Sequence, residues 1–168
     1  MKKNIVLIGM PGSGKTTVGR RLAEMLNMEF VDTDAMVERA QGMTVPQIFQ
    51  RFGESGFRDM ESWAAKTAAD MDGVVIATGG GMVLRQENMQ ALAATGIIFF
   101  RDRPVEDIAG QDMSGRPLVG ADTERLYHLY DQRIHLYRTY AHHIISDTQT
   151  PEQAAEQIAA RYAQECEV

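Results

Sequence analysis

Apolar and polar residues alternate along the 168-residue chain with two different periods. Short runs that are almost entirely apolar predict buried strands at residues 5–8, 30–31, 74–77, 97–100 and 143–145. Polar stretches with apolar residues three or four positions apart predict helices between them. The predicted helices span residues 17–26, 34–39, 45–52, 62–71, 86–94, 124–140 and 151–164.

This alternation predicts one α/β domain over residues 1–168, with a mostly parallel five-stranded sheet flanked by helices in three layers. The runs 5–8, 74–77 and 97–100 are apolar throughout, as expected of parallel strands covered on both faces. Ligands of such sheets bind beyond the carboxyl ends of the strands. The polar residues that follow the strands are therefore the first candidates for a site.

The segment after the first predicted strand reads Gly-Met-Pro-Gly-Ser-Gly-Lys-Thr at positions 9–16, which is the G-x-x-x-x-G-K-[ST] phosphate-loop pattern. We expect Lys15 to reach the β- and γ-phosphates of a nucleotide and the Thr16 hydroxyl to ligate Mg²⁺. A plain glycine-rich turn is the alternative. The residues predicted to bind the nucleotide are Gly12, Ser13, Gly14, Lys15, Thr16 and Thr17.

Two carboxylates, Asp32 and Asp34, follow the second predicted strand. One is expected to hold Mg²⁺ through water, and the other to accept a hydrogen bond and a proton from an acceptor hydroxyl. The alternative is that Thr33 or Asp34 serves only to cap the helix that follows.

Two further motifs lie near the middle of the chain. Arg58 and Glu61 share a face if their segment is helical, and the alternative to a binding role is a weak surface ion pair. The run Gly79, Gly80 and Gly81 follows the third strand and predicts close approach of the backbone to a ligand, or else a tight turn.

Two arginines in the second half of the chain are also candidates. Arg116 lies in residues 110–123, a polar, glycine-rich stretch that predicts a mobile loop. An arginine on a closing loop can meet the charge that develops on a transferring phosphoryl group. Arg133 lies on a predicted helix. A solvated arginine is the alternative for each.

In this order and spacing, the motifs resemble the shikimate kinase family. The resemblance extends from the first strand to about Tyr140. It implies a P-loop kinase fold with a mobile lid, and an enzyme that transfers the γ-phosphoryl group of ATP, with Mg²⁺, to the 3-hydroxyl of shikimate on the route to chorismate and the aromatic amino acids. The segments that carry it are 9–16, Asp32-Thr33-Asp34, Phe57-Arg58-x-x-Glu61, Gly79-Gly80-Gly81, Arg116-Pro117-Leu118 and Arg133-x-x-Leu136-Tyr137.

The resemblance also implies roles for single residues. Asp34 would hold shikimate hydroxyls and act as base, and Arg58 and Arg133 would grip the shikimate carboxylate. The Gly80 backbone would close on the ring, and Gly79 and Gly81 beside it would also belong to the substrate-binding residues. Arg116 would be the lid arginine, while Lys15, Thr16 and Asp32 would serve ATP and Mg²⁺.

The sequence departs from the family at several positions, one of which concerns the adenine site. Many relatives carry an adenine-stacking arginine where this chain has Ala109, and Arg101 or Arg103 is a possible substitute. Related acceptors therefore stay open as alternatives: a gluconate-kinase-like or nucleoside-monophosphate-kinase-like enzyme, or a nucleotide-binding regulator without transfer activity.

Composition limits the kinds of binding partner and the location that are expected for the protein. The net charge of −6 argues against a general binder of nucleic acid or of anionic membranes, so a phosphorylated ligand needs local basic groups. The single cysteine, Cys166, has no internal partner for a disulfide and fits a reducing compartment. No apolar run approaches the ~18 residues of a membrane span. We expect a cytoplasmic monomer that binds ATP and a small acceptor.

Overall fold

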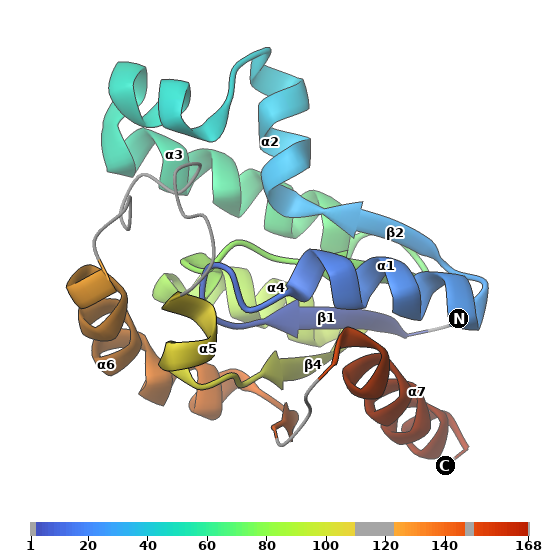
Figure 1. Cartoon of the computed structure of the whole chain (residues 1–168). Helices are drawn as coiled ribbons and strands as arrows, with labels where there is room; N and C mark the ends of the chain where they lie inside the picture. Colours follow the sequence, from blue (N-terminus) through green and yellow to red (C-terminus); the bar gives the residue numbers. More distant parts are fainter. Residues whose placement is uncertain (1–2, 110–122, 147–149, 168) are drawn as a thin grey trace.

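The computed structural model describes residues 3–109, 123–146 and 150–167. Its strands form one sheet in the order β2-β3-β1-β4-β5, and every neighbouring pair is parallel (Figure 1). All five predicted strands are confirmed. They are β1 (Asn4–Ile8), β2 (Glu29–Asp32), β3 (Val74–Ala77), β4 (Gly96–Arg101) and β5 (His143–Ile145). Strands β3 and β5 have the predicted limits, and the other three are one residue longer at one or both ends.

Helices follow the strands as the periodicity predicts. They are α1 (Lys15–Leu26), α2 (Thr33–Gln41), α3 (Val45–Ala69), α4 (Gln86–Thr95), α5 (Val105–Ala109), α6 (Thr123–Tyr140) and α7 (Pro151–Cys166), with a 3₁₀ helix η1 (Met82–Leu84). The sequence does not predict α5 and η1, because elements this short show no helical period. None of the helices in the described ranges combines the length and apolar character that a bilayer crossing needs.

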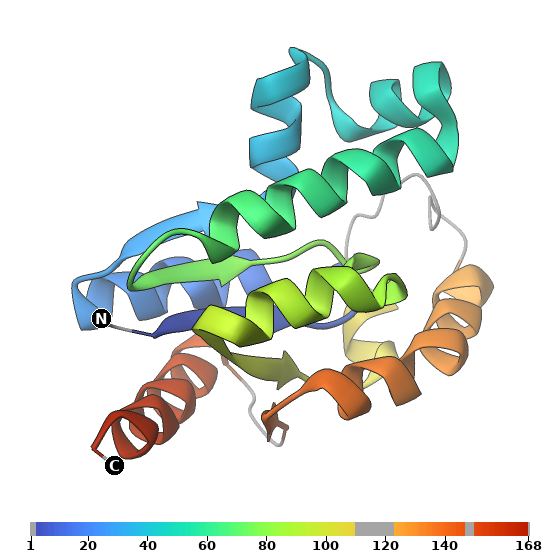
Figure 2. The ribbon, with the colours of Figure 1, turned by 180° about the vertical axis from the view of Figure 1, so that it is seen from behind.

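The sheet lies between two layers of helices (Figures 1 and 2). Side chains alternate across a strand, so Ile5 and Leu7 of β1 belong to the core under α1 and α7. Val6 and Ile8 belong to the opposite core, to which α3, α4 and α6 contribute. All four side chains are completely buried. Because β1 is the central strand and is buried on both faces, its carboxyl end and the loop that follows it are held in a fixed position.

Helix α3 refines one prediction. The two helices predicted at 45–52 and 62–71 are both present within Val45–Ala69, and they meet at a kink at Gly53, whose φ of 72° and ψ of 179° are not helical. Glycine tolerates this positive φ without a Cβ clash. The first helix therefore ends before Gly53, and the second begins directly after it and not at residue 62, so residues 54–61 are helical.

A small third core lies where α2 meets α3, on both sides of the Gly53 kink. It contains Val37, Ile48, Phe57 and Ala64, apart from the cores on either side of the sheet. This packing fixes the part of α3 that carries Arg58 next to the carboxyl ends of the strands.

Candidate active site

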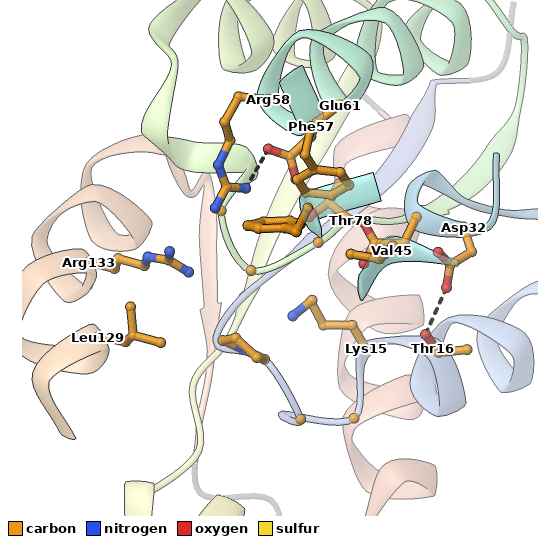
Figure 3. Close-up of a pocket in the computed structure, with 18 of the residues that line it drawn as sticks. Lys15, Thr16, Asp32, Val45, Phe57, Arg58, Glu61, Thr78, Leu129 and Arg133 are labelled. Atoms are coloured by element: carbon orange, nitrogen blue, oxygen red, sulfur yellow. Dashed lines mark hydrogen bonds and ion pairs between the residues drawn. The ribbon is translucent and has the colours of Figure 1, made fainter. Parts of the chain in front are cut away.

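A cleft of about 270 Å³ opens beyond the carboxyl ends of β1, β2 and β3 (Figure 3). Phosphate-loop, acidic, glycine-rich and arginine motifs that lie far apart in the sequence all reach it. Its walls are formed by Pro11, Gly12, Gly14, Lys15, Thr16, Thr17, Asp32, Asp34, Val45, Phe49, Phe57, Arg58, Glu61, Thr78, Gly79, Gly80, Gly81, Leu129 and Arg133.

The phosphate loop has the backbone that its glycines predict. Gly12 and Gly14 have φ values of 76° and 90°, in the left-handed region. Lys15 Nζ donates to the carbonyl oxygens of Gly9 at 2.6 Å and Met10 at 2.8 Å. Because α1 begins at Lys15, its N-terminal N–H groups and dipole add to an anion site at this point.

The predicted nucleotide residues lie together. Gly12, Gly14, Lys15, Thr16 and Thr17 line the cleft. Ser13 differs from them: its side chain is buried, and its hydroxyl accepts a long hydrogen bond from Lys15 Nζ at 3.5 Å.

Asp32 links the first two elements of the site. Its Oδ2 accepts a hydrogen bond from the Thr16 hydroxyl at 3.0 Å, and its Oδ1 accepts one from the Ala35 N–H at 3.1 Å. Asp32 is therefore the cap of α2, and the alternative that Thr33 or Asp34 caps this helix is wrong. The reason is that the chain is extended at Asp32 (φ −115°, ψ 121°) and already helical at Thr33, one residue earlier than a Thr33 cap requires.

Asp34 lies in the first turn of α2 and forms part of the cleft wall. Its Oδ1 is enclosed and accepts no hydrogen bond from the described residues. Burial raises the pKa of Asp34 to about 7, and the negative charges of Glu61 and Asp32 act in the same direction. The Lys15 ammonium opposes this rise but does not cancel it. A carboxyl with such a pKa can exchange a proton near neutral pH.

The predicted pair of Arg58 and Glu61 is present, but it is not a surface pair. Arg58 Nη1 lies 2.9 Å from Glu61 Oε1, and the two residues are only 8% and 1% exposed. Arg58 Nη2 also reaches Glu54 Oε1 at 3.4 Å. Burial raises the pKa of Glu61, while the Arg58 guanidinium acts against that rise. The pair fixes Arg58 in the cleft wall.

Arg133 reaches the cleft from α6, on the other side from Arg58 (Figure 3). It is only 4% exposed, which excludes the alternative of a solvated helix arginine. Within the described residues, no carboxylate pairs with it. A buried guanidinium that points into a cleft and forms no direct ion pair with the described residues favours an anionic ligand there.

The three glycines are needed for close approach. None of them has a positive φ, so the turn itself does not require glycine. A Cβ on Gly79 would lie 2.7 Å from Asp34 Oδ1, and one on Gly80 would lie 2.6 Å from Pro11 Cδ. A Cβ on Gly81 would overlap the Arg58 guanidinium. At each of these glycines the backbone of the turn therefore lies close to another part of the site.

Several lining residues are missing from the sequence prediction. Val45, Phe49, Phe57 and Leu129 form apolar parts of the cleft wall. No signal distinguishes them, because apolar residues at helical spacing are equally typical of a core. Glu61 had a detectable signal, its three-residue spacing from Arg58.

Two predictions concern the nucleotide end of the site. Arg116 lies outside the described residues. Arg101 and Arg103 are the candidates to replace the adenine-stacking arginine that relatives carry where this chain has Ala109. Arg101 is only 2% exposed, and burial lowers its pKa, whereas Arg103 is partly exposed and is therefore the more accessible of the two.

Comparisons with known proteins agree with this geometry. The family model described as shikimate kinase matches residues 11–164. A shikimate kinase of Thermodesulfovibrio yellowstonii is 42% identical over 165 residues, which are 95% of each chain. One from Clostridium beijerinckii is 42% identical over 146 residues, 86% of each. The solved shikimate kinase of Acinetobacter baumannii in complex with shikimate superposes with a TM-score of 0.86 and 38% identity, and the match covers 98% of this chain and 92% of that one.

These matches span nearly the whole chain and leave the gluconate-kinase, nucleotide-kinase and regulator alternatives without support. The motifs predicted from the sequence meet in one cleft, and the family model covers all of them from residue 11 onwards. The chain therefore belongs to the shikimate kinase family and is an ATP-dependent phosphotransferase of the shikimate pathway, which supplies the aromatic amino acids.

Proposed function

We propose that the cleft binds shikimate with its carboxylate between Arg58 and Arg133, and that the phosphate loop holds ATP so that the γ-phosphoryl group faces the 3-hydroxyl. One observation carries this proposal: two buried guanidiniums from different helices point into the cleft that contains the phosphate loop. The superposable Acinetobacter enzyme, which was solved with shikimate, supports the same acceptor.

The two arginines suit a carboxylate. A guanidinium presents parallel N–H groups that match both oxygens of a carboxylate, whereas an ammonium offers a point charge. Arg58 is held by Glu61 at 2.9 Å and therefore loses little freedom on binding. The positive charges are also needed locally, because the protein as a whole carries a net charge of −6.

We assign the acceptor hydroxyl to Asp34. Its carboxylate would accept the hydrogen bond of the hydroxyl and take its proton as the new P–O bond forms and the bond to ADP breaks. A pKa near 7 leaves a large ionised fraction at neutral pH. Lys15 would stabilise the charge on the transferring group. The transition state is loose, so positioning contributes more than base strength.

Thr16 and Asp32 are the proposed Mg²⁺ ligands. The Thr16 hydroxyl and an Asp32 oxygen lie 3.0 Å apart beside the phosphate loop. This donor set fits Mg²⁺, which is usually bound through one or two carboxylates, phosphate oxygens and waters. When bound, the ion would neutralise phosphate charge during transfer.

The remaining assignments are also proposals. Residues 33–61 would form the substrate-binding segment of a single domain, since Asp34, Phe57 and Arg58 all come from it. The lid function of 110–123, and of Arg116 within it, is proposed from the sequence, since residues 110–122 lie outside the described residues. The lone cysteine and the acidic composition support a cytoplasmic location, and we propose a monomer.

An ADP-release assay with shikimate, quinate, gluconate and AMP tests the acceptor. We expect clear preference for shikimate, and we expect Arg58→Ala and Arg133→Ala each to raise its KM about tenfold or more, because each removes charge-assisted hydrogen bonds in the ground state. Arg51→Ala is the matched control, since Arg51 is exposed on α3 and does not line the cleft. Unchanged KM values in both cleft variants would contradict the carboxylate assignment.

A further inference from the structure

Tyr137 is a buried polar residue at the junction of three segments of the site. Its hydroxyl donates a hydrogen bond to the carbonyl oxygen of Gly80 at 2.6 Å. The Tyr137 hydroxyl oxygen also lies 3.9 Å from the sulfur of Met10, in the phosphate loop. Tyr137 itself lies on α6 and is 0% exposed. One hydroxyl therefore connects α6 to the glycine turn and contacts the phosphate loop.

The ring that carries this hydroxyl is held in place. It stacks on Phe100 of β4, with ring centroids 5.0 Å apart and planes inclined by 22°. Both rings are fully buried in the core that includes α6 and β4. Because the ring cannot shift without disturbing this core, the hydroxyl has a fixed position relative to the sheet.

Arg133 lies one helical turn before Tyr137, and the i, i+4 spacing places both on the same face of α6. A tyrosine hydroxyl that donates to one partner can still accept from another. Burial raises the pKa of Tyr137 to about 12, while the Arg133 guanidinium favours the ionised form through its charge and a hydrogen bond. The hydroxyl thus keeps its proton at neutral pH and continues to donate to Gly80.

The two neighbours of this hydroxyl form opposite parts of the acceptor site. Gly80 and Arg133 both line the cleft, Gly80 from the turn after β3 and Arg133 from α6. Gly80 is further confined by Pro11, because a Cβ at this position would lie 2.6 Å from Pro11 Cδ. The Tyr137 hydroxyl therefore interacts with groups on both of these parts of the acceptor site.

We propose that Tyr137 is a positioning residue for the acceptor, because its hydroxyl ties the Gly80 carbonyl to α6 and so holds the Arg133 guanidinium at the distance that shikimate requires. This inference rests on the proposed carboxylate role of Arg133. Tyr137 does not touch the reacting atoms, and it acts through the two groups that line the cleft.

The variant Tyr137→Phe removes only the hydroxyl and keeps the stacked ring. We expect the KM for shikimate to rise about tenfold, as for the loss of one hydrogen bond in a buried charged site, with a smaller change in kcat. The KM for ATP should change by less than about twofold, because the Gly80 bond lies on the acceptor side.

Tyr162→Phe is a matched control. Tyr162 is also buried, at 8% exposure, and its hydroxyl also donates to a backbone carbonyl, that of Lys3, at 2.7 Å. Tyr162 lies on α7 and reaches the residue just before β1, at the end of that strand opposite to the cleft. Both substitutions keep the ring, so both should fold and lose similar stability in urea. Only Tyr137→Phe should change the KM for shikimate.

A double-mutant cycle with Arg133→Lys distinguishes failure of the Tyr137 inference from failure of the proposed carboxylate role of Arg133. If Tyr137 acts by positioning Arg133, the effect of Tyr137→Phe on the KM for shikimate should shrink when Arg133 is already lysine. An unchanged KM in Tyr137→Phe, with stability reduced as in Tyr162→Phe, would show a merely structural residue and overturn the inference alone. An unchanged KM in Arg133→Ala would instead overturn the proposed carboxylate role.

Discussion

Replacing Asp34 by asparagine is expected to stabilise the protein above neutral pH while it lowers kcat about 100-fold or more. Asparagine keeps the shape of the side chain but has no charge and accepts no proton. The two effects have one cause, since the enclosed carboxylate that we assign to the acceptor hydroxyl is also costly to ionise in the folded state.

The size of the stability gain follows from the pKa. Folding raises the pKa of Asp34 from 3.8 to about 7, first through burial and then through Glu61 and Asp32. Each unit corresponds to about 1.4 kcal/mol, so the ionised group destabilises the folded state by at most about 4 kcal/mol. Because the cleft admits water, we expect asparagine to recover about 2 to 4 kcal/mol at about pH 8.

The sign follows from proton linkage. A carboxyl whose pKa rises on folding stabilises the folded state fully below the unfolded pKa of 3.8, and that contribution is lost as the pH rises through about 7. Wild-type stability should therefore fall between about pH 4 and pH 8 by this contribution, and the asparagine variant should lack that part of the decline.

Urea unfolding of both proteins at about pH 5 and about pH 8, with kcat measured on the same samples, provides the test. The stability difference between variant and wild type should be larger at the higher pH. Equal stability of the two proteins at about pH 8 would refute the reasoning, because it would mean that the Asp34 carboxylate is not destabilised by its surroundings.

Further expectations concern the pH profile and two neighbouring residues. The kcat/KM for shikimate should decline below about pH 7, because protonated Asp34 accepts no proton, and a profile flat down to about pH 5 would contradict this. Asp32→Asn should raise the Mg²⁺ concentration for half-maximal activity about tenfold or more. Asparagine still caps α2, so a loss of urea stability in place of this shift would count against the metal role. Gly81→Ala should displace the Arg58 guanidinium and raise the KM for shikimate more than that for ATP. Equal KM changes for both substrates would indicate general disruption.

Much of the fold can be predicted from local patterns. The run at 74–77 is a strand with the same limits in the structure, and a glycine-rich loop that follows a buried strand and opens a helix has few other conformations. These predictions succeed because strand burial and phosphate-loop geometry depend on neighbours in sequence.

Features that depend on contacts between distant segments cannot be predicted in this way. The break between the two predicted helices is confined to Gly53, and the second helix begins before residue 62, since Phe57 packs in one core with Val37 and Ile48 and keeps residues 54–61 helical despite Gly56. The three-residue spacing predicts that Arg58 pairs with Glu61, but it does not tell whether the pair lies on the surface or is buried. The burial of that pair is decided by how α3 lies on the other elements.

The sequence by itself determined the strands, the longer helices, the phosphate loop and the residue types suited to phosphate and carboxylate, because these depend on neighbours along the chain. Only the tertiary structure decided that Asp34 lies close enough to Glu61 for its pKa to rise, that Arg133 points into the cleft, and that Tyr137 reaches Gly80 from a position 57 residues away. Burial and close approach between distant segments arise from packing, and packing leaves no periodic signal in a single sequence.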